Sequence, residues 1–516
     1  MIGEKTDNKT MAKNTVLLYV RMMFTMVISL YTSRVILAVL GIDDYGIYQA
    51  VGGVVAMLSF VNNALSTGSS RFLTFELGTG NADKLKRTFS SLLTAHILLA
   101  LVVVVLAETA GLWFVYHKLV IPAERLSAAV TAYHFSIVTA VIQIIVVPYS
   151  ASVIAHERMG VYAYVSILDA VLKLAICYLL SVGGLDKLVL YAMLLCTIQV
   201  VNILIYRGYC VKHFAESHYK PMWDKPILKE VLGYSGWNLF ANTALALITY
   251  GSSILLNMFF TSVVVTAMAV SNQVNGAAQQ FVNSFRTAAN PQIVKKYAVG
   301  DLVGSKKLLL ASTKYSFYLM LLLAIPLFFV ADEVLHLWLK EVPEYTTIFV
   351  RVTIATCLFQ VFDTSFYTAL YAKGRIKENA LLSPSVLFLL FIIVYFSFRG
   401  GYSSPLILSY GLCIAYAILA LVVKPLLIIK IAGYKWREIL GVFVDCLKVF
   451  AVALVIPVLL YKFSGQLFQS NLVRSLVLVA ASLMSVCASV WAIGLTPEMR
   501  GKVMGFIKGK FRRKAS

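Results

Sequence analysis

Charged residues are scarce in this chain of 516 residues. Asp, Glu, Lys and Arg make up 13% of it, whereas soluble domains contain about 25%. The hydrophobic share is 60%, and the mean hydropathy is +0.82. Each membrane span needs about 20 apolar residues, so this composition leaves room for many spans and little for a soluble domain.

Paired cysteines are also lacking. None of the seven occurs in a CxxC motif, and each stands alone in an apolar stretch, so we expect neither a disulfide framework nor a zinc site. The N-terminal segment is polar and basic, and the first apolar stretch is too long for a signal peptide. We therefore expect that stretch to be retained as the first span.

Motifs of covalent chemistry are missing as well. The chain has no GxxxxGK[ST] phosphate loop, no HExxH, and no GxSxG in a suitable setting. The loops expected outside the membrane, near 116–125 and 331–345, are too short to carry a catalytic site. We therefore predict a protein that is not an enzyme and not an ATP-driven pump, with no catalytic residues, no metal and no organic cofactor.

The chain does contain long hydrophobic stretches, and fourteen of them have spanning length. Because lipid satisfies no backbone polar group, each must be a helix, and the predicted class is an all-α polytopic membrane protein with about 14 transmembrane helices. The stretches are 14–40, 45–72, 88–115, 126–155, 160–182, 187–209, 230–260, 263–294, 308–331, 345–372, 378–398, 404–430, 439–462 and 472–494.

The basic residues predict the orientation of these helices. With the N-terminus in the cytoplasm, most of the 45 Lys and Arg residues fall in cytoplasmic loops or the C-terminal tail. Few fall outside: Lys118, Arg125, Lys187, Lys340, Arg399, Lys462 and Arg474. The net charge of +21 is thus a positive-inside signal of a multi-pass inner-membrane protein with both termini cytoplasmic, and it indicates contact with membrane lipids rather than with nucleic acid.

Two halves of the chain show weak similarity. Gly80-Asn81 is matched by Gly300-Asp301 at an offset of 220, and Ala155-His156 by Ala372-Lys373 at an offset of 217. We predict an N-terminal six-helix bundle at 1–212, a cytoplasmic linker at 213–229, a repeat of the bundle at 230–431, and two additional helices with a basic tail at 432–516. Six spans per repeat give both halves one orientation, with a substrate path between them.

Several cations lie at membrane depth, where charge is costly unless it faces a cavity or a partner. Arg21, Arg286 and Lys314 come from both halves at similar depths from the cytoplasmic face, and we interpret them as a cationic site for a phosphate or another anion. Snorkelling to the interface is the alternative, and we favour it for residues nearer to span ends. These are Arg34, Arg71, Arg351 and Lys424.

Carboxylates at membrane depth are the candidate coupling residues. Asp363 has no partner nearby in the sequence and is the first candidate for a protonatable group. Asp169 and Lys173 share a helix face at i, i+4, either as a proton or substrate site or as a self-neutralising pair. For Asp445 and Lys448 we favour the self-neutralising pair.

The stretch 263–294 carries a hydrophilic stripe at spacings of three and four residues. Such a stripe cannot face lipid, so it must face protein or water, and we interpret it as lining the transport path, although amides also join helices. The candidate lining residues here are Asn272, Asn275, Gln279, Asn283 and Asn290, together with Asn238 and Asn242 of the preceding span.

Several short motifs resemble those of bacterial Wzx-type polysaccharide flippases, members of the multidrug/oligosaccharidyl-lipid/polysaccharide (MOP) exporter superfamily. The motifs are Ser33-Arg34-Val35, Asp44-Tyr45-Gly46, Arg71-Phe72 before Gly80-Asn81, Gly236-Trp237-Asn238-Leu239-Phe240, Leu256-Asn257-Met258-Phe259-Phe260, and Asn290-Pro291-Gln292-Ile293-Val294 before Gly300-Asp301. They are spread over most of the first twelve spans.

The resemblance implies two six-helix bundles in a MATE/MurJ-like V, with two more helices at the C-terminus. It implies alternating access that moves an undecaprenyl-pyrophosphate-linked oligosaccharide to the periplasmic leaflet for O-antigen, capsule or exopolysaccharide synthesis. H+ or Na+ is the candidate coupling ion, and a polysaccharide polymerase and a chain-length regulator are candidate partners. Relatives that flip lipid II carry arginines on spans one, two and eight, where Arg21, Arg71 and Arg286 lie here.

Three alternatives remain at this point. A lipid II flippase differs mainly in its substrate. An ion-coupled multidrug antiporter on the same fold binds cations and needs an acidic cavity, against which the basic interior argues. A non-transporting scaffold or biosynthetic enzyme has no use for the polar stripe.

Overall fold

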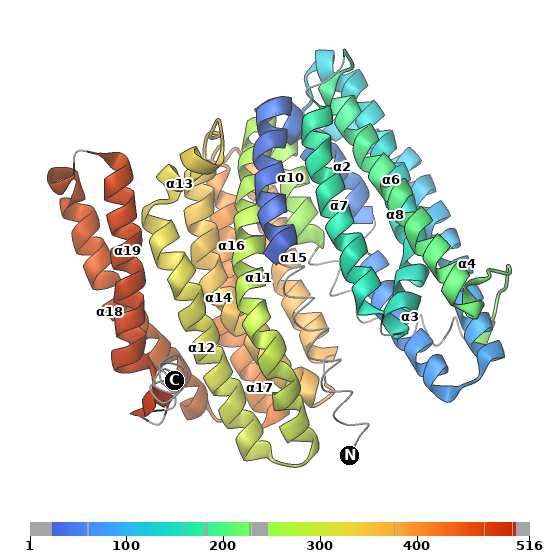
Figure 1. Cartoon of the computed structure of the whole chain (residues 1–516). Helices are drawn as coiled ribbons and strands as arrows, with labels where there is room; N and C mark the ends of the chain where they lie inside the picture. Colours follow the sequence, from blue (N-terminus) through green and yellow to red (C-terminus); the bar gives the residue numbers. More distant parts are fainter. Residues whose placement is uncertain are drawn as a thin grey trace, which may run out of the picture. The chain divides into compact units, whose positions relative to one another are not determined.

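The computed structural model of this chain (Figure 1) describes residues 23–58, 61–156, 158–180, 184–226, 229, 246–375, 377–468, 470–497 and 499–501. All regular elements in these ranges are helices, which confirms the all-α prediction. Within them, eleven helices are long and apolar enough to cross a membrane, in agreement with a multi-pass membrane protein.

The chain divides into two compact units. The N-terminal unit comprises Met1–Val270, Trp338–Thr346 and Leu387–Pro405, and the C-terminal unit comprises Ser271–Leu337, Thr347–Val386 and Leu406–Ser516. Two helices, α11 (Ser262–Ala298) and α15 (Lys377–Arg399), contribute several turns to each unit. The helices α13 (Ala331–Trp338) and α14 (Thr346–Ala372) have one terminal residue each, Trp338 and Thr346, in the N-terminal unit. The division into two six-helix repeats and two additional helices stays a prediction.

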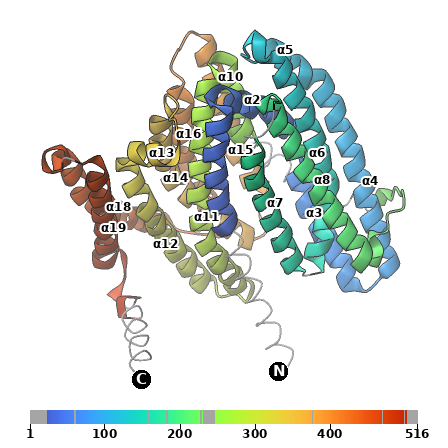
Figure 2. The ribbon, with the colours of Figure 1, turned by 45° about the horizontal axis from the view of Figure 1, so that its top comes forward.

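The N-terminal unit is organised around α6, which packs against α2, α3, α4 and α8. Figures 1 and 2 show α4, α6 and α8 side by side. Besides the helix Met23–Leu40, its elements are α2 (Ile42–Leu58), α3 (Val61–Thr79), α4 (Ala82–Leu106), α5 (Leu112–Lys118), α6 (Leu126–Ala155), α7 (Met159–Leu179), α8 (Lys187–His213) and α10 (Ser252–Phe259).

In the C-terminal unit, α12 packs against both α18 and α19. Figures 1 and 2 show α18 and α19 side by side. The core contains an aromatic cluster in which the ring of Phe362 lies 5.0 Å from Phe443 and 5.1 Å from Phe317. Besides α11, the helices of this unit are α12 (Leu302–Phe329), α13 (Ala331–Trp338), α14 (Thr346–Ala372), α16 (Leu406–Ile418), α17 (Lys424–Ala432), α18 (Trp436–Leu467) and α19 (Asn471–Ser489).

The two turns singled out by the offset of 220 have the same local structure. Gly80 and Gly300 both adopt a positive φ, of 72° and 83°, which only glycine accepts without strain. In each case the next side chain caps the following helix: Asn81 accepts from the N–H of Lys84, and Asp301 accepts from the N–H of Gly304.

The first part of the predicted linker packs on the N-terminal unit. The buried carboxylate of Glu216 accepts from Ser152 Oγ at 3.1 Å and lies 2.7 Å from His156 Nε2. The hydroxyl of Tyr219 lies 3.1 Å from Thr94 Oγ1 on α4. This segment is therefore held by side-chain hydrogen bonds to the middle of α4 and to the end of α6.

An ionic cluster joins three helices of the N-terminal unit on the side predicted to be external. Arg125, before α6, donates to Asp44 of α2 at 2.6 and 2.8 Å and to Asp186, the N-cap residue of α8, at 3.1 Å. Asp186 also accepts from the N–H of Leu188 at 3.0 Å. The hydrogen bond from Arg125 is the main cause that lowers the pKa of Asp186 below its ordinary value.

Asp186→Asn tests this cluster, because it keeps the capping oxygen and removes the charge. A lowered pKa in the folded state stabilises above the ordinary pKa of the carboxyl, and this stabilisation is lost as the pH falls through the lowered value. We expect the variant to lose about 1 kcal/mol or less at neutral pH, since the pair is partly exposed. The deficit should shrink at acidic pH.

Thermal unfolding of the purified protein at neutral and acidic pH measures the effect. Glu124→Gln, at an exposed carboxylate beside Arg125, is the control for charge alone. A deficit that does not change with pH would contradict the electrostatic explanation.

Candidate functional site

A ladder of side-chain hydrogen bonds joins α11 and α14 in the C-terminal unit. Residue numbers rise together along the two helices, so the helices run parallel. The pairs are Ser271 with Thr353 at 2.6 Å, Asn275 with Cys357 at 3.7 Å, Gln279 with Gln360 at 2.6 Å, and Asn290 with Thr368 at 3.3 Å. Much of the predicted polar stripe is therefore satisfied by a neighbouring helix.

The stripe still has members outside this ladder. Asn283 is exposed and Asn272 is half-buried. Both remain candidates for lining a path, whereas Asn275, Gln279 and Asn290 also help to hold two helices together.

Arg286 lies within the same pair of helices and is only 7% exposed. Its guanidinium donates to the backbone carbonyl of Thr364 and, at 3.2 Å, to Asn283 Oδ1. Its charge is within electrostatic range of Asp363. A buried arginine with two neutral acceptors keeps further N–H donors that an anion could use.

Asp363 is paired with a residue far away in the sequence. Lys424 Nζ of α17 lies 3.1 Å from Asp363 Oδ1, donates a hydrogen bond to Asn379 Oδ1, and lies 5.5 Å from the centre of the Tyr367 ring. Lys424 is 2% exposed, so our expectation that it snorkels is wrong. Lys424 stays buried because α14 and α15 place the carboxylate of Asp363 and the amide of Asn379 next to its ammonium group.

The other charged candidates have separate partners. Lys314 lies 3.1 Å from Asp445 of α18, so Asp445 does not depend on Lys448 as we expected, because α18 packs on α12. Asp169 and Lys173 form the i, i+4 pair at 2.7 Å, and Asn202 of α8 donates to Asp169 at 2.8 Å.

The cationic site proposed from sequence is only partly visible. Arg286 and Lys314 both belong to the C-terminal unit, but each is bonded to different residues. Arg21, Asn238 and Asn242 lie outside the described residues, and Arg71 lies on α3 in a position whose side chain is not described.

Sequence reasoning missed the partners on α14. Thr353, Cys357, Gln360, Thr364 and Thr368 follow spacings of three and four, the same signal that marked the stripe on α11. It was hidden because threonine and cysteine count as nearly apolar within a hydrophobic span. Among the described residues, no group of three or more His, Cys, Asp or Glu side chains is placed to hold a metal ion.

Comparison with known proteins places this fold. No protein-family model matches the chain, and no curated protein matches it by sequence. A MATE-family multidrug resistance transporter of the MOP superfamily in its inward-facing conformation matches with a TM-score of 0.63 and 14% identity, over 81% of this chain and 98% of that structure. The lipid II flippase MurJ, in an inward closed conformation, matches with a TM-score of 0.65 and 11% identity, over 92% and 98%.

A third match is a MOP superfamily transporter from Pyrococcus furiosus, described as having a binding pocket of reverse polarity, with a TM-score of 0.57 and 16% identity over 82% of this chain and 96% of that structure. These likenesses show the fold. The chain is folded as MATE transporters and MurJ are, which confirms the predicted class.

The Asp363–Lys424 pair allows a test by double substitution. Lys424→Met should destabilise the protein by about 3–5 kcal/mol, because it leaves a poorly exposed carboxylate without its cation. Adding Asp363→Asn to Lys424→Met should restore part of the loss. Thermal unfolding of the four proteins of the cycle measures the coupling, and strictly additive effects would show that the pair does not interact.

Proposed function

We propose that this protein is a flippase, which moves undecaprenyl-pyrophosphate-linked oligosaccharide repeat units from the cytoplasmic to the periplasmic leaflet of the bacterial inner membrane by alternating access. The fold of MATE transporters and MurJ supports a transporter rather than an enzyme. The short Wzx-type motifs support the polysaccharide substrate. A polysaccharide polymerase and a chain-length regulator are the partners that this role requires.

The observation that carries the proposal is the buried guanidinium of Arg286. The guanidinium donates hydrogen bonds to a backbone carbonyl and to an amide oxygen, and neither acceptor carries a charge that would neutralise the cation. One of these partners, Asn283, is exposed, so the guanidinium is bonded to a side chain at the surface of its unit. Arginine binds phosphate oxygens through strong charge-assisted hydrogen bonds, which suits a pyrophosphate.

The Asp363–Lys424 pair is the proposed coupling element. Asp363 lies in the electrostatic field of Arg286, so an anion that binds to Arg286 changes the cost of a negative charge on Asp363. Uptake of H+ or Na+ by that carboxylate is thereby linked to substrate binding. Asp169, with Lys173 and Asn202 around it, is the second candidate.

Two other functions fit the same fold. A lipid II flippase uses the same diphosphate chemistry, and MurJ, which has that activity, covers 92% of this chain. A multidrug antiporter binds cationic compounds, and the buried guanidinium of Arg286, whose hydrogen-bond acceptors are neutral, argues against it. Polysaccharide export, lipid II export and drug resistance are separate phenotypes, which distinguishes the three.

Complementation of a strain that lacks its own O-antigen flippase tests the proposal. At equal membrane abundance, we expect the unmodified chain to restore surface polysaccharide and Arg286→Ala to lower it at least about tenfold, which is 1.4 kcal/mol of lost binding. Arg21→Ala should have a similar effect if that residue belongs to the site.

Arg351→Ala is the matched control. Arg351 lies on α14, donates to the carbonyl of Phe328 at 3.2 Å, and has no part in the Arg286 network. Normal export by Arg286→Ala would exclude the site. Rescue of a lipid II flippase deletion, with no rescue of O-antigen, would select the lipid II alternative.

Coupling to an ion gradient is tested separately, in vesicles that contain the purified protein and a labelled lipid-linked oligosaccharide. Dissipating the driving gradient should slow flipping, since return of the empty carrier then lacks a driving force. Ionophores selective for H+ and for Na+ identify the ion. A flipping rate that survives the loss of both gradients would eliminate the coupled mechanism.

A further inference from the structure

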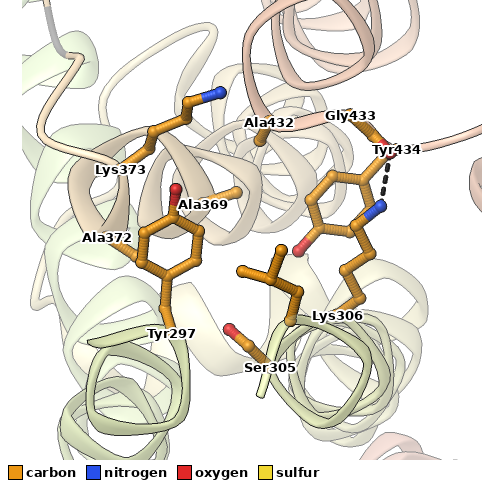
Figure 3. Close-up of a pocket in the computed structure, with 10 residues that line it drawn as sticks. Tyr297, Ser305, Lys306, Ala369, Ala372, Lys373, Ala432, Gly433 and Tyr434 are labelled. Atoms are coloured by element: carbon orange, nitrogen blue, oxygen red, sulfur yellow. Dashed lines mark hydrogen bonds between the residues drawn. The ribbon is translucent and has the colours of Figure 1, made fainter. Parts of the chain in front are cut away.

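A small cavity lies in the C-terminal unit where α11, α12, α14 and α17 end or begin, on the side predicted to face the cytoplasm (Figure 3). Its volume is about 210 Å³, room for roughly seven water molecules at about 30 Å³ each. Alanines and a glycine leave this space open. The polar side chains that line it are Tyr297, Ser305, Lys306, Lys373 and Tyr434.

Two ammonium groups are fixed at this cavity by the end of α17. Lys306 Nζ donates to the carbonyl of Gly433, and Lys373 Nζ donates to the carbonyl of Ile431. Figure 3 shows the two lysines on different sides of the cavity, with the bond from Lys306 drawn. An ammonium has three N–H donors, so each lysine retains two after its bond to α17.

The cavity has positive charge without a carboxylate of its own. None of its lining residues is acidic. The nearest acids along the chain have other partners. Asp301 binds Lys296 at 2.9 Å and caps α12, Glu378 accepts from the guanidinium of Arg375, and Glu438 accepts from the N–H of Lys435 at 2.8 Å. Lys307 on α12 is exposed, which adds to the positive field outside the cavity.

The N-terminal unit provides an internal comparison. His156 is the first residue after α6, as Lys373 is the first after α14, and the two match at the offset of 217. His156 is bonded to the carboxylate of Glu216, the third residue after α8, and its ring stacks on Phe214 at 3.9 Å.

The C-terminal unit lacks that carboxylate. The third residue after α17 is Lys435, so the sequence has a basic residue at the position that Glu216 occupies after α8. In the N-terminal unit a carboxylate and an aromatic ring thus contact His156, whereas in the C-terminal unit two lysines line a cavity without a carboxylate.

We propose that this cavity binds a phosphate group, either the headgroup phosphate of an anionic membrane lipid or a soluble phosphate compound. Lysines act as point charges for phosphate, and basic pockets between helices on the cytoplasmic side suit anionic headgroups. The hydroxyls of Tyr297 and Tyr434 are further donors at the cavity wall. The site shares no residue with the Arg286 network, and it stands whether or not the chain is a flippase.

Native mass spectrometry of the purified full-length protein tests the site. Phosphatidylglycerol is the anionic probe and phosphatidylcholine the zwitterionic one. We expect the unmodified protein to retain phosphatidylglycerol, and the double variant Lys306→Gln, Lys373→Gln to retain it about tenfold less. Lys307→Gln removes the same charge one residue away and should retain the lipid as the unmodified protein does.

A second experiment, with inorganic phosphate as the probe, distinguishes a lipid headgroup from a soluble phosphate compound. If it displaces phosphatidylglycerol, or stabilises the unmodified protein but not the double variant, a soluble phosphate compound is a ligand. If only the lipid binds, the ligand is a headgroup.

Both lysines also bond to the end of α17, so the double variant should have a lower Tm for that reason alone. We therefore compare, for each protein, the Tm measured with phosphatidylglycerol and the Tm measured with phosphatidylcholine. If the two lysines have only a structural role, the difference between these two Tm values is the same in the double variant as in the unmodified protein. The proposal is overturned if the double variant matches the unmodified protein in this Tm difference and in lipid retention. It is also overturned if Lys307→Gln loses as much lipid as the double variant, or if the unmodified protein binds neither phosphatidylglycerol nor inorganic phosphate.

Discussion

The contact between α11 and α14 shows the constraint on which the rest of the interior depends: a polar side chain at membrane depth must find its partner inside the protein. In these two helices the partners are supplied in register. Serine faces threonine and glutamine faces glutamine along a parallel pair, so the most hydrophilic helix of the chain is placed by hydrogen bonds as well as by shape. Hydrophobic burial gives little orientation between helices in lipid, and such bonds supply it.

The same constraint governs the charges. Lys424 is almost fully buried and has a carboxylate, an amide and an aromatic ring around it. Arg286, by contrast, has carbonyl and amide partners and only a more distant carboxylate. The first arrangement is nearly neutral as a group, and the second retains a net positive charge. This difference distinguishes a residue that holds helices together from one that can hold a ligand.

Local features could be predicted from sequence because they depend on near neighbours. The i, i+4 spacing of Asp169 and Lys173 predicted their shared face, and the structure pairs them. Asn81 and Asp301 follow a glycine before a helix, and both cap it. The apolar stretches predicted helices, and helices are found, since lipid permits little else.

Partners from distant parts of the chain could not be predicted. Lys424 was assigned to the interface because its helix position is near a span end, yet α14 and α15 bring Asp363 and Asn379 to it. Asp445 was matched with its near neighbour, yet α12 supplies Lys314. Spacing along one helix identifies a face, but the charge on the facing helix depends on packing, for which a single sequence has no direct signal.

The residues that follow α6 and α14 show two ways in which a basic side chain finds a partner. In the N-terminal unit, the residue after α6 is a histidine that is bonded to the carboxylate of Glu216 and stacks on Phe214. In the C-terminal unit, Lys373 after α14 donates to the carbonyl of Ile431 on α17, and Lys306 donates to the carbonyl of Gly433 directly after it. The carbonyls at a helix C-terminus are attractive to cations but only partly neutralise them. Cations that are held by helix carbonyls rather than by an internal carboxylate therefore form a net positive site that an external oxyanion can satisfy.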